Sequence, residues 1–285
     1  MFIGFRFKHA VAFFLLFLFI LSAGLGGGAA LRASSLKTET VRLPVLMYHS
    51  VCVNKRAGGE YVLPPEKFCA DMEYLCREGY TAVFFSEVLA FTRGEASLPE
   101  KPVVVTLDDG FLNNLTVVLP VLEALDMKAE INVVGAYTQK EETAEYRSDA
   151  YSYLNAEELK TLAESGRIEI GSHTYDMHGL SGRQGCLRAA GETPAQYENA
   201  LRTDIKKMRD EVLVPCGIET QIFAYPFGAV SREAQEILTD AGFTVLLTCR
   251  ETVNVLSVGD TLTQLGRINR PASMSTQAFM EKFGL

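Results

Sequence analysis

Apolar strand-like runs and helix-like runs alternate along most of this chain, and that alternation limits its fold more than any other feature. The runs that predict strands are residues 42–48, 80–85, 102–107, 128–135, 167–172, 221–227, 243–249 and 261–268. Regular alternation of apolar strands with helices predicts a parallel sheet with helical crossovers. Seven or eight such βα units favour an α/β barrel, complete or incomplete, over an open sheet.

Amphipathic segments between these strands predict the helices. They are residues 64–79, 113–126, 155–166, 193–213 and 231–242. Asn155 and Glu158 have the spacing of a capping box, and Gly166 and Gly242 are placed as helix C-caps.

The first thirty residues differ from the rest and indicate export. Residues 10–31 carry no charge and follow a basic start, a pattern typical of a signal peptide or of one membrane anchor. Small residues at Gly28 and Ala30 suit a cleavage site, whereas the length of the apolar run suits an uncleaved anchor. Both alternatives place the protein outside the cytoplasm. Residues 32–40 predict a linker and residues 41–285 the functional domain.

Net charge limits the class of ligand, and cysteine spacing limits the possible disulfides and thiolate metal sites. The formal net charge of −8 argues against nucleic acid and anionic polymers as ligands. Six cysteines in an exported chain raise the question of disulfides, but Cys69 and Cys76 lie seven residues apart on one predicted helix, too far to bridge. The chain has no CxxC motif for a thiolate zinc site.

Polar side chains follow three predicted strands directly. Residues 102–107 lead into Asp108 and Asp109, two adjacent carboxylates that are costly to desolvate together. The three histidines outside the leader come after strands in the same way, as His49, His173 and His178. In such barrels the chemistry lies at the carboxyl ends of the strands. We therefore expect these side chains to share one site.

One carboxylate and two imidazoles make a three-ligand metal site with open positions. A divalent cation would offset one of the two aspartates, and the other could take a proton from an activated water. Gly110 would permit the backbone turn that brings both carboxylates to one place. Zinc, cobalt, nickel and manganese all suit such ligands, with zinc as the first choice.

These motifs resemble the polysaccharide deacetylases of carbohydrate esterase family 4. Residues 106–110 resemble the family motif TFDDG, and residues 173–178 (HTYDMH) resemble its metal-binding histidine pair. The resemblance covers most of residues 41–272 and implies a distorted (β/α) barrel. It also implies that Asp108 is the catalytic base and that Asp109, His173 and His178 bind the metal. The histidine spacing, with residues 47–51 (MYHSV), is similar to the branch that acts on poly-N-acetylglucosamine of biofilms.

The chain departs from the family pattern in several places. Ala224 stands where many members carry an arginine that orients the base, and the chain contains no tryptophan. Residues 265–267 (LGR) replace the usual LxH, so the general-acid histidine of the family is missing. His49 is the remaining histidine and becomes the candidate acid. The resemblance suggests the backbone N–H of Phe227 as an oxyanion donor. Single aromatic side chains near the strand ends (Tyr48, Tyr175, Tyr225 and Phe227) could contact sugar rings.

The sequence therefore predicts an exported, metal-dependent hydrolase. It would remove acetyl groups from N-acetylglucosamine residues of a cell-wall or extracellular polysaccharide. Two other classes remain open: a glycoside hydrolase with paired carboxylates, which would leave the histidines unexplained, and a non-catalytic polysaccharide-binding domain. An iron-dependent oxygenase would share the ligand set but not the barrel.

Overall fold

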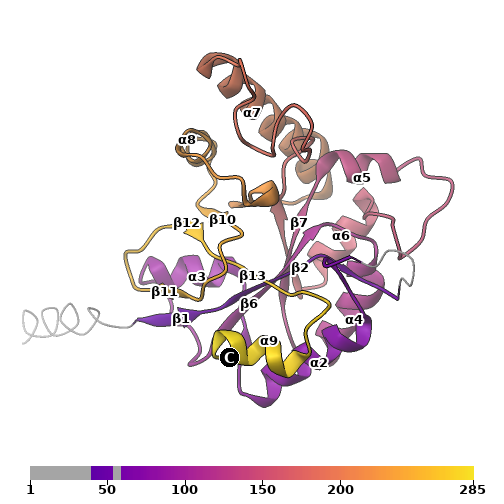
Figure 1. Ribbon diagram of the computed structural model, residues 1–285, viewed down its shortest axis with the longest axis vertical. Helices are drawn as coiled ribbons and strands as arrows, with labels where there is room; N and C mark the ends of the chain where they lie inside the picture. The colour runs from indigo at the N-terminus through magenta and orange to yellow at the C-terminus, as the bar shows by residue number, and fades with distance from the viewer. Residues whose placement is uncertain (1–39, 54–58) are drawn as a thin grey trace, which may run out of the picture. The chain divides into compact units, whose positions relative to one another are not determined.

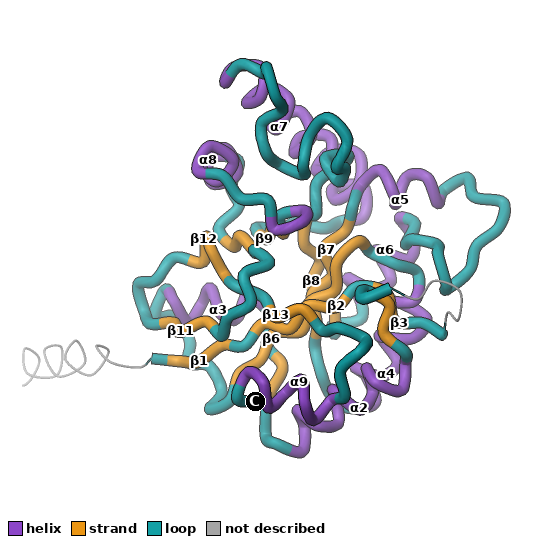
Figure 2. The backbone as a smooth tube through the Cα atoms, in the orientation of Figure 1, coloured by secondary structure: helices purple, strands orange, loops and turns teal. Residues whose placement is uncertain are grey.

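The computed structural model describes residues 40–53 and 59–285, and residues 41–285 form one compact unit. Its centre is a nine-stranded sheet with parallel pairing throughout, in the order β12-β10-β9-β8-β7-β6-β2-β13, with β5 also paired to β6. Its strands are β2 (Val45–Tyr48), β5 (Thr81–Ala82), β6 (Pro102–Asp109), β7 (Ala129–Val133), β8 (Ile168–Ser172), β9 (Ile222–Ala224), β10 (Val245–Leu247), β12 (Leu262–Leu265) and β13 (Ile268–Asn269). Figures 1 and 2 show the strands at the centre with helices around them.

The two ends of this sheet are consecutive strands. β12 pairs with β10 and β13 pairs with β2, and only Gly266 and Arg267 separate them. No ladder joins β12 to β13 within the described residues, so the curled sheet stays open and the chain itself crosses from one edge to the other. The predicted parallel α/β sheet is confirmed. The single strand predicted over residues 261–268 is wrong, because the chain changes edges in its middle.

Eight α-helices are found in the described residues, and they surround the sheet (Figure 1). They are α2 (Pro65–Arg77), α3 (Phe85–Thr92), α4 (Leu119–Ala124), α5 (Gly135–Glu141), α6 (Ala156–Glu164), α7 (Pro194–Met208), α8 (Arg232–Asp240) and α9 (Thr276–Phe283). The predicted capping box at Asn155 is confirmed, and Gly166 and Gly242 follow their helices with positive φ. The helix predicted over residues 113–126 begins as a π-helical turn, Asn114–Val118.

Two predicted strands are shorter than expected, for local reasons. The run 80–85 gives only β5, because the Glu87 carboxylate accepts from the N–H of Phe84 and the Glu169 carboxylate accepts from that of Phe85, so a helix starts there. The run 221–227 ends as a strand at Ala224, because Pro226 opens a short 3₁₀ turn.

Two small ladders complete the unit. β1 (Val41–Leu43) pairs with β11 (Asn254–Leu256) in antiparallel fashion. β3 (Ser50–Val51) pairs with β4 (Val62–Leu63) in parallel. Neither ladder joins the main sheet.

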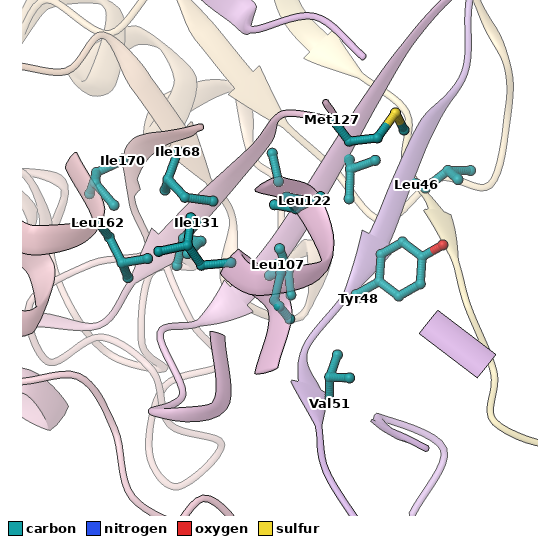
Figure 3. Close-up of a cluster of buried hydrophobic side chains, with 14 of the residues drawn as sticks. Leu46, Tyr48, Val51, Leu107, Leu122, Met127, Ile131, Leu162, Ile168 and Ile170 are labelled. Carbon is teal, nitrogen blue, oxygen red and sulfur yellow. The ribbon is translucent and has the colours of Figure 1, made fainter. Parts of the chain in front are cut away.

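The two faces of the central strands differ in chemistry. On β6, Leu107 belongs to a buried hydrophobic cluster together with Ile131 of β7 and Leu122 of α4, so this face packs against helices (Figure 3). Side chains alternate along a strand, so Thr106 and Asp108 point to the opposite face. This opposite face lines the interior of the curled sheet. It is buried but polar, and it also carries Glu130 and Asn132 of β7.

Two predictions connected with export lie partly outside this unit. The predicted leader, residues 1–31, and nearly all of the linker, residues 32–39, fall outside the described residues. Within the described part of the chain, no helix has the length and apolar character needed to cross a bilayer. All six cysteines lie in the described part, and each is unpaired.

Candidate metal centre and active site

Three of the predicted residues meet at the carboxyl ends of β6 and β8. Asp109 is the last residue of β6, His173 follows β8 directly, and His178 lies in the loop beyond it. Each offers one ligand atom, and these atoms all lie within 4.8 Å of one another. The side chains are buried or half-buried. The structure therefore brings together the carboxylate and both imidazoles that the sequence singled out.

The spacing of these atoms fits a cation better than a hydrogen bond. Oδ1 of Asp109 lies 3.2 Å from Nε2 of His178 and 3.8 Å from Nε2 of His173. Among the described residues, this buried oxygen has no partner with hydrogen-bond geometry. Ligand atoms about 2.0–2.2 Å from one zinc ion stand roughly 3–3.5 Å apart in a tetrahedral site. The residues present thus fit a divalent metal.

Left-handed backbone at both strand ends makes this convergence possible. Asp109 has φ of 73°, followed by Gly110, also at 73°. Side chains of consecutive strand residues point to opposite faces, so this turn lets Asp108 and Asp109 serve the same site. Thr174, between the two histidines, has φ of 76°. Non-glycine residues in this region cost of order 1–3 kcal/mol each and often mark functional sites.

Neighbouring groups orient both imidazole rings. Nδ1–H of His173 donates to the backbone oxygen of Ala224 at 2.8 Å, which leaves the Nε2 lone pair toward Asp109. Nδ1 of His178 lies 3.3 Å from the Tyr137 hydroxyl, whose oxygen accepts from Nδ1–H in the tautomer that leaves the Nε2 lone pair toward Asp109. Such outer partners fix the tautomer that a metal requires.

Protonation of the histidines follows from their surroundings. Burial lowers the pKa of His173 to about 4, so this imidazole is neutral at pH 7. Burial also opposes the charged form of His178, but the Asp109 carboxylate outweighs it and raises the pKa of that ring. A proton on His178 competes with a metal for the same nitrogen, so metal affinity falls as the pH falls.

Asp108 is held by a different set of groups. Its oxygens accept from Nη1 and Nη2 of Arg267 at 2.6 and 2.8 Å, and Oδ1 also accepts from Nδ2 of Asn132 at 3.0 Å. Burial by itself raises the pKa of Asp108, but the Arg267 guanidinium outweighs burial and holds it well below the usual range. Asp108 is therefore an ionised carboxylate beside the candidate metal ligands, 4.0 Å from Nε2 of His173.

Arg267 is a residue of the candidate site that the sequence did not single out as a partner of Asp108. Two departures from the family pattern are connected in the structure: Ala224 stands in place of an orienting arginine, and Arg267 in place of a histidine. Because Arg267 lies between β12 and β13, where the chain crosses the open edge of the sheet, its side chain reaches Asp108 across the interior. The signal in the sequence was that the usual arginine is missing at Ala224 while another arginine, Arg267, follows a different strand.

His49 lies near the same groups. It follows β2, and its ring lies against that of Tyr61 with centroids 4.6 Å apart and the two planes tilted by 53°. Burial lowers the pKa of His49, although the two carboxylates oppose this. Nδ1 is buried and has no hydrogen-bond partner among the described residues. The imidazole of His49 is thus neutral at pH 7.

Three of the aromatic rings predicted to contact sugar are buried. Tyr225 is fully buried against Phe223, and Tyr48 and Tyr175 are also in the core, so these rings offer no face to a polymer in this structure. Phe227 is 41% exposed and its ring lies 4.8 Å from that of His178. With φ of 58°, Phe227 is a further residue in the left-handed region at the site.

Comparison with known proteins agrees with this geometry. The family model for polysaccharide deacetylases matches residues 95–246, more than half of the 285 residues. The chain belongs to the polysaccharide deacetylase family. It is a deacetylase of the hydrolase class, and the matched region includes the metal-binding candidates.

Relatives and solved structures cover most of this deacetylase. It is 29% identical over 246 residues to the putative polysaccharide deacetylase YxkH of Bacillus subtilis, covering 86% of this chain and 77% of that protein. It is 26% identical over 218 residues to the poly-beta-1,6-N-acetyl-D-glucosamine N-deacetylase of Escherichia coli K12, covering 70% of this chain but only 32% of that protein.

Solved structures show the same fold. IcaB from Ammonifex degensii superimposes with a TM-score of 0.68 at 26% identity, covering 85% of this chain and 95% of that one. The Streptococcus pyogenes deacetylase PplD superimposes with a TM-score of 0.67 at 21% identity, covering 85% of this chain and 98% of that one. The curled parallel sheet is therefore the fold of solved deacetylases.

The metal centre generates the first prediction. Asp109→Ala, His173→Ala and His178→Ala should each lower divalent-metal affinity by more than the about 10- to 100-fold expected for loss of an outer partner. Asp176→Ala is the matched control, because its exposed side chain lies in the same loop and is not a ligand candidate. Elemental analysis and metal titration of the folded proteins measure the effect. Equal metal content in all variants would contradict the assignment.

Proposed function

We propose that this deacetylase is a metal-dependent hydrolase that removes acetyl groups from N-acetylglucosamine residues of a cell-wall or extracellular polysaccharide. The observation that carries the proposal is the ionised, buried Asp108 beside the three-ligand cluster of Asp109, His173 and His178. The similarity to the Escherichia coli enzyme named for poly-N-acetylglucosamine supports the substrate class. The apolar segment 10–31 supports a location outside the cytoplasm, as a secreted or anchored protein.

The chemistry divides between the two aspartates. A divalent cation held by Asp109 and the two histidines would polarise the acetyl carbonyl and lower the pKa of a water molecule, and zinc is the ion that these ligands suit first. Asp108 then acts as the general base. Arg267 keeps it ionised and fixes the plane of its carboxylate, so it is ready to take a proton.

The leaving amine needs a proton before the carbon–nitrogen bond breaks. His49 is neutral at rest, so it can donate a proton only after receiving one, and the proton that Asp108 removes from water is available nearby. We assign His49 to this transfer. The backbone N–H of Phe227 remains the proposed oxyanion donor, because its ring packs on His178 and so places this backbone beside the metal ligands.

The alternatives explain less of the site. A glycoside hydrolase needs two carboxyl groups that flank a bond, whereas Asp108 is tied to Arg267 and Asp109 faces the histidines. A binding module would not need a carboxylate kept ionised beside a set of three candidate metal ligands. The family match also favours deacetylation over both.

The experiment that tests the function is acetate release from a panel of acetylated glycans, with metal stripped and then restored. Asp108→Asn should retain metal, because the ligand set is intact, and should lose about 10²- to 10⁴-fold in rate, the usual contribution of a general base. Reducing-end release without acetate would instead indicate a glycosidase. If Asp108→Asn loses the metal and Asp109→Asn retains it, the two roles are reversed.

The Arg267–Asp108 contact generates a second prediction. Arg267→Lys keeps the positive charge but loses the paired hydrogen bonds. The pKa of Asp108 should then rise toward its usual value, which moves the acidic limb of the pH–rate profile to higher pH because the base must be ionised. We expect activity to fall about 10- to 100-fold with metal content unchanged. Arg250→Lys, at an exposed arginine nearby, is the control. An unmoved acidic limb would contradict this role.

His49 generates a third prediction. His49→Ala should retain metal and lose most acetate release from amide substrates, about 10²-fold or more. Activated acetyl esters, whose leaving groups depart without a proton, should be hydrolysed with much smaller losses. Rates on both substrate types for wild type and variant measure the difference. Losses of equal size on both would indicate that His49 only orders the site.

A further inference from the structure

The loop that carries both histidine ligands is strained and must be held from outside. Only residues 174–177 separate His173 from His178. Thr174 is β-branched and fully buried with φ of 76°, and its hydroxyl has no hydrogen-bond partner in the described part of the chain. A left-handed conformation at such a residue costs of order 1–3 kcal/mol and persists only when surrounding contacts enforce it.

One carboxylate supplies much of that enforcement. Asp204 lies in the middle of α7 and is 8% exposed. Its Oδ1 accepts from the N–H of Tyr175 at 2.8 Å, and its Oδ2 accepts from the N–H of Asp176 at 2.8 Å. Hydrogen bonds to an ionised acceptor are about twice as strong as neutral ones. Both bonds hold the centre of the histidine loop.

The start of α5 holds the same loop from its carbonyl side. The N–H of Gly135 donates to the Thr174 oxygen at 3.1 Å, and the N–H of Ala136 donates to the Tyr175 oxygen at 2.8 Å. A Cβ at Gly135 would lie 2.6 Å from the Tyr175 ring and 2.9 Å from the sulfur of Met208, so no larger residue fits this contact. The backbone of the loop is therefore bound on two sides.

We infer that Asp204 is a positioning residue of the metal centre: by binding two successive N–H groups, it holds residues 174–177 in the strained conformation that directs His173 and His178 toward Asp109. Asp204 acts through the loop and is not itself a ligand candidate. The inference rests on the proposed function in one respect, the identity of the metal ligands. It is therefore tested by metal affinity rather than by acetate release.

Asp204→Asn is the decisive variant. The asparagine oxygen can accept from one N–H, but its amide nitrogen faces the other and cannot. Zinc affinity, measured by competition with a chelator, should fall about 10- to 100-fold while circular dichroism of the metal-free protein stays unchanged. Asp210→Asn makes the same chemical change six residues along the same helical segment, at an exposed ion pair with Lys206, and should bind zinc like wild type.

A second variant separates positioning from general stability. Thr174→Gly removes the penalty for positive φ, so the double variant with Asp204→Asn should recover part of the lost zinc affinity. A merely structural role for Asp204 predicts no such recovery. Wild-type affinity in folded Asp204→Asn, or an unchanged deficit in the double variant, would overturn the inference. A wild-type protein that binds no zinc would overturn the ligand assignment itself.

Discussion

The ion pair between Arg267 and Asp108 is the interaction on which the site depends. Asp108 is 2% exposed and Arg267 is fully buried, so each charge would be costly to desolvate without the other. Arg267 also donates to the backbone oxygen of Thr248 at 3.1 Å, which leaves few of its donors unpaired. The pair spans the interior of the curled sheet from β6 to the segment between β12 and β13. It therefore joins the open edges of the sheet to the site.

Backbone strain is concentrated around the same point. Four non-glycine residues with positive φ occur in the described part of the chain, and three of them, Asp109, Thr174 and Phe227, surround the metal-binding candidates. Each allows a side chain or an N–H to leave the alternation that a strand would impose. Regular structure alone could not place two adjacent carboxylates in one site. The surrounding sheet and helices supply the packing that keeps these conformations in place.

A row of aromatic rings leads to His178 at the candidate metal centre. Ring centroids are separated by 4.9 Å between Phe111 and Tyr153, 4.4 Å between Tyr153 and Tyr137, and 5.8 Å between Tyr137 and His178. All four rings are half-buried. The sequence directed attention to tyrosines beside the strand ends, whereas these rings come from connecting segments that only the folded chain brings together.

Sequence alone predicted the parallel α/β class and singled out the residues that meet at the candidate metal centre, because the apolar runs that alternate with helices, and the polar residues at the ends of Pro102–Asp109 and Ile168–Ser172, are local features of the chain. It missed Arg267, because the contact with Asp108 joins residues 159 positions apart and exists only after the sheet curls. It also missed the lowered pKa of His49, since burial, and not residue type, sets that direction. The sequence shows which residue types follow each strand, whereas the tertiary fold decides which charged groups become partners.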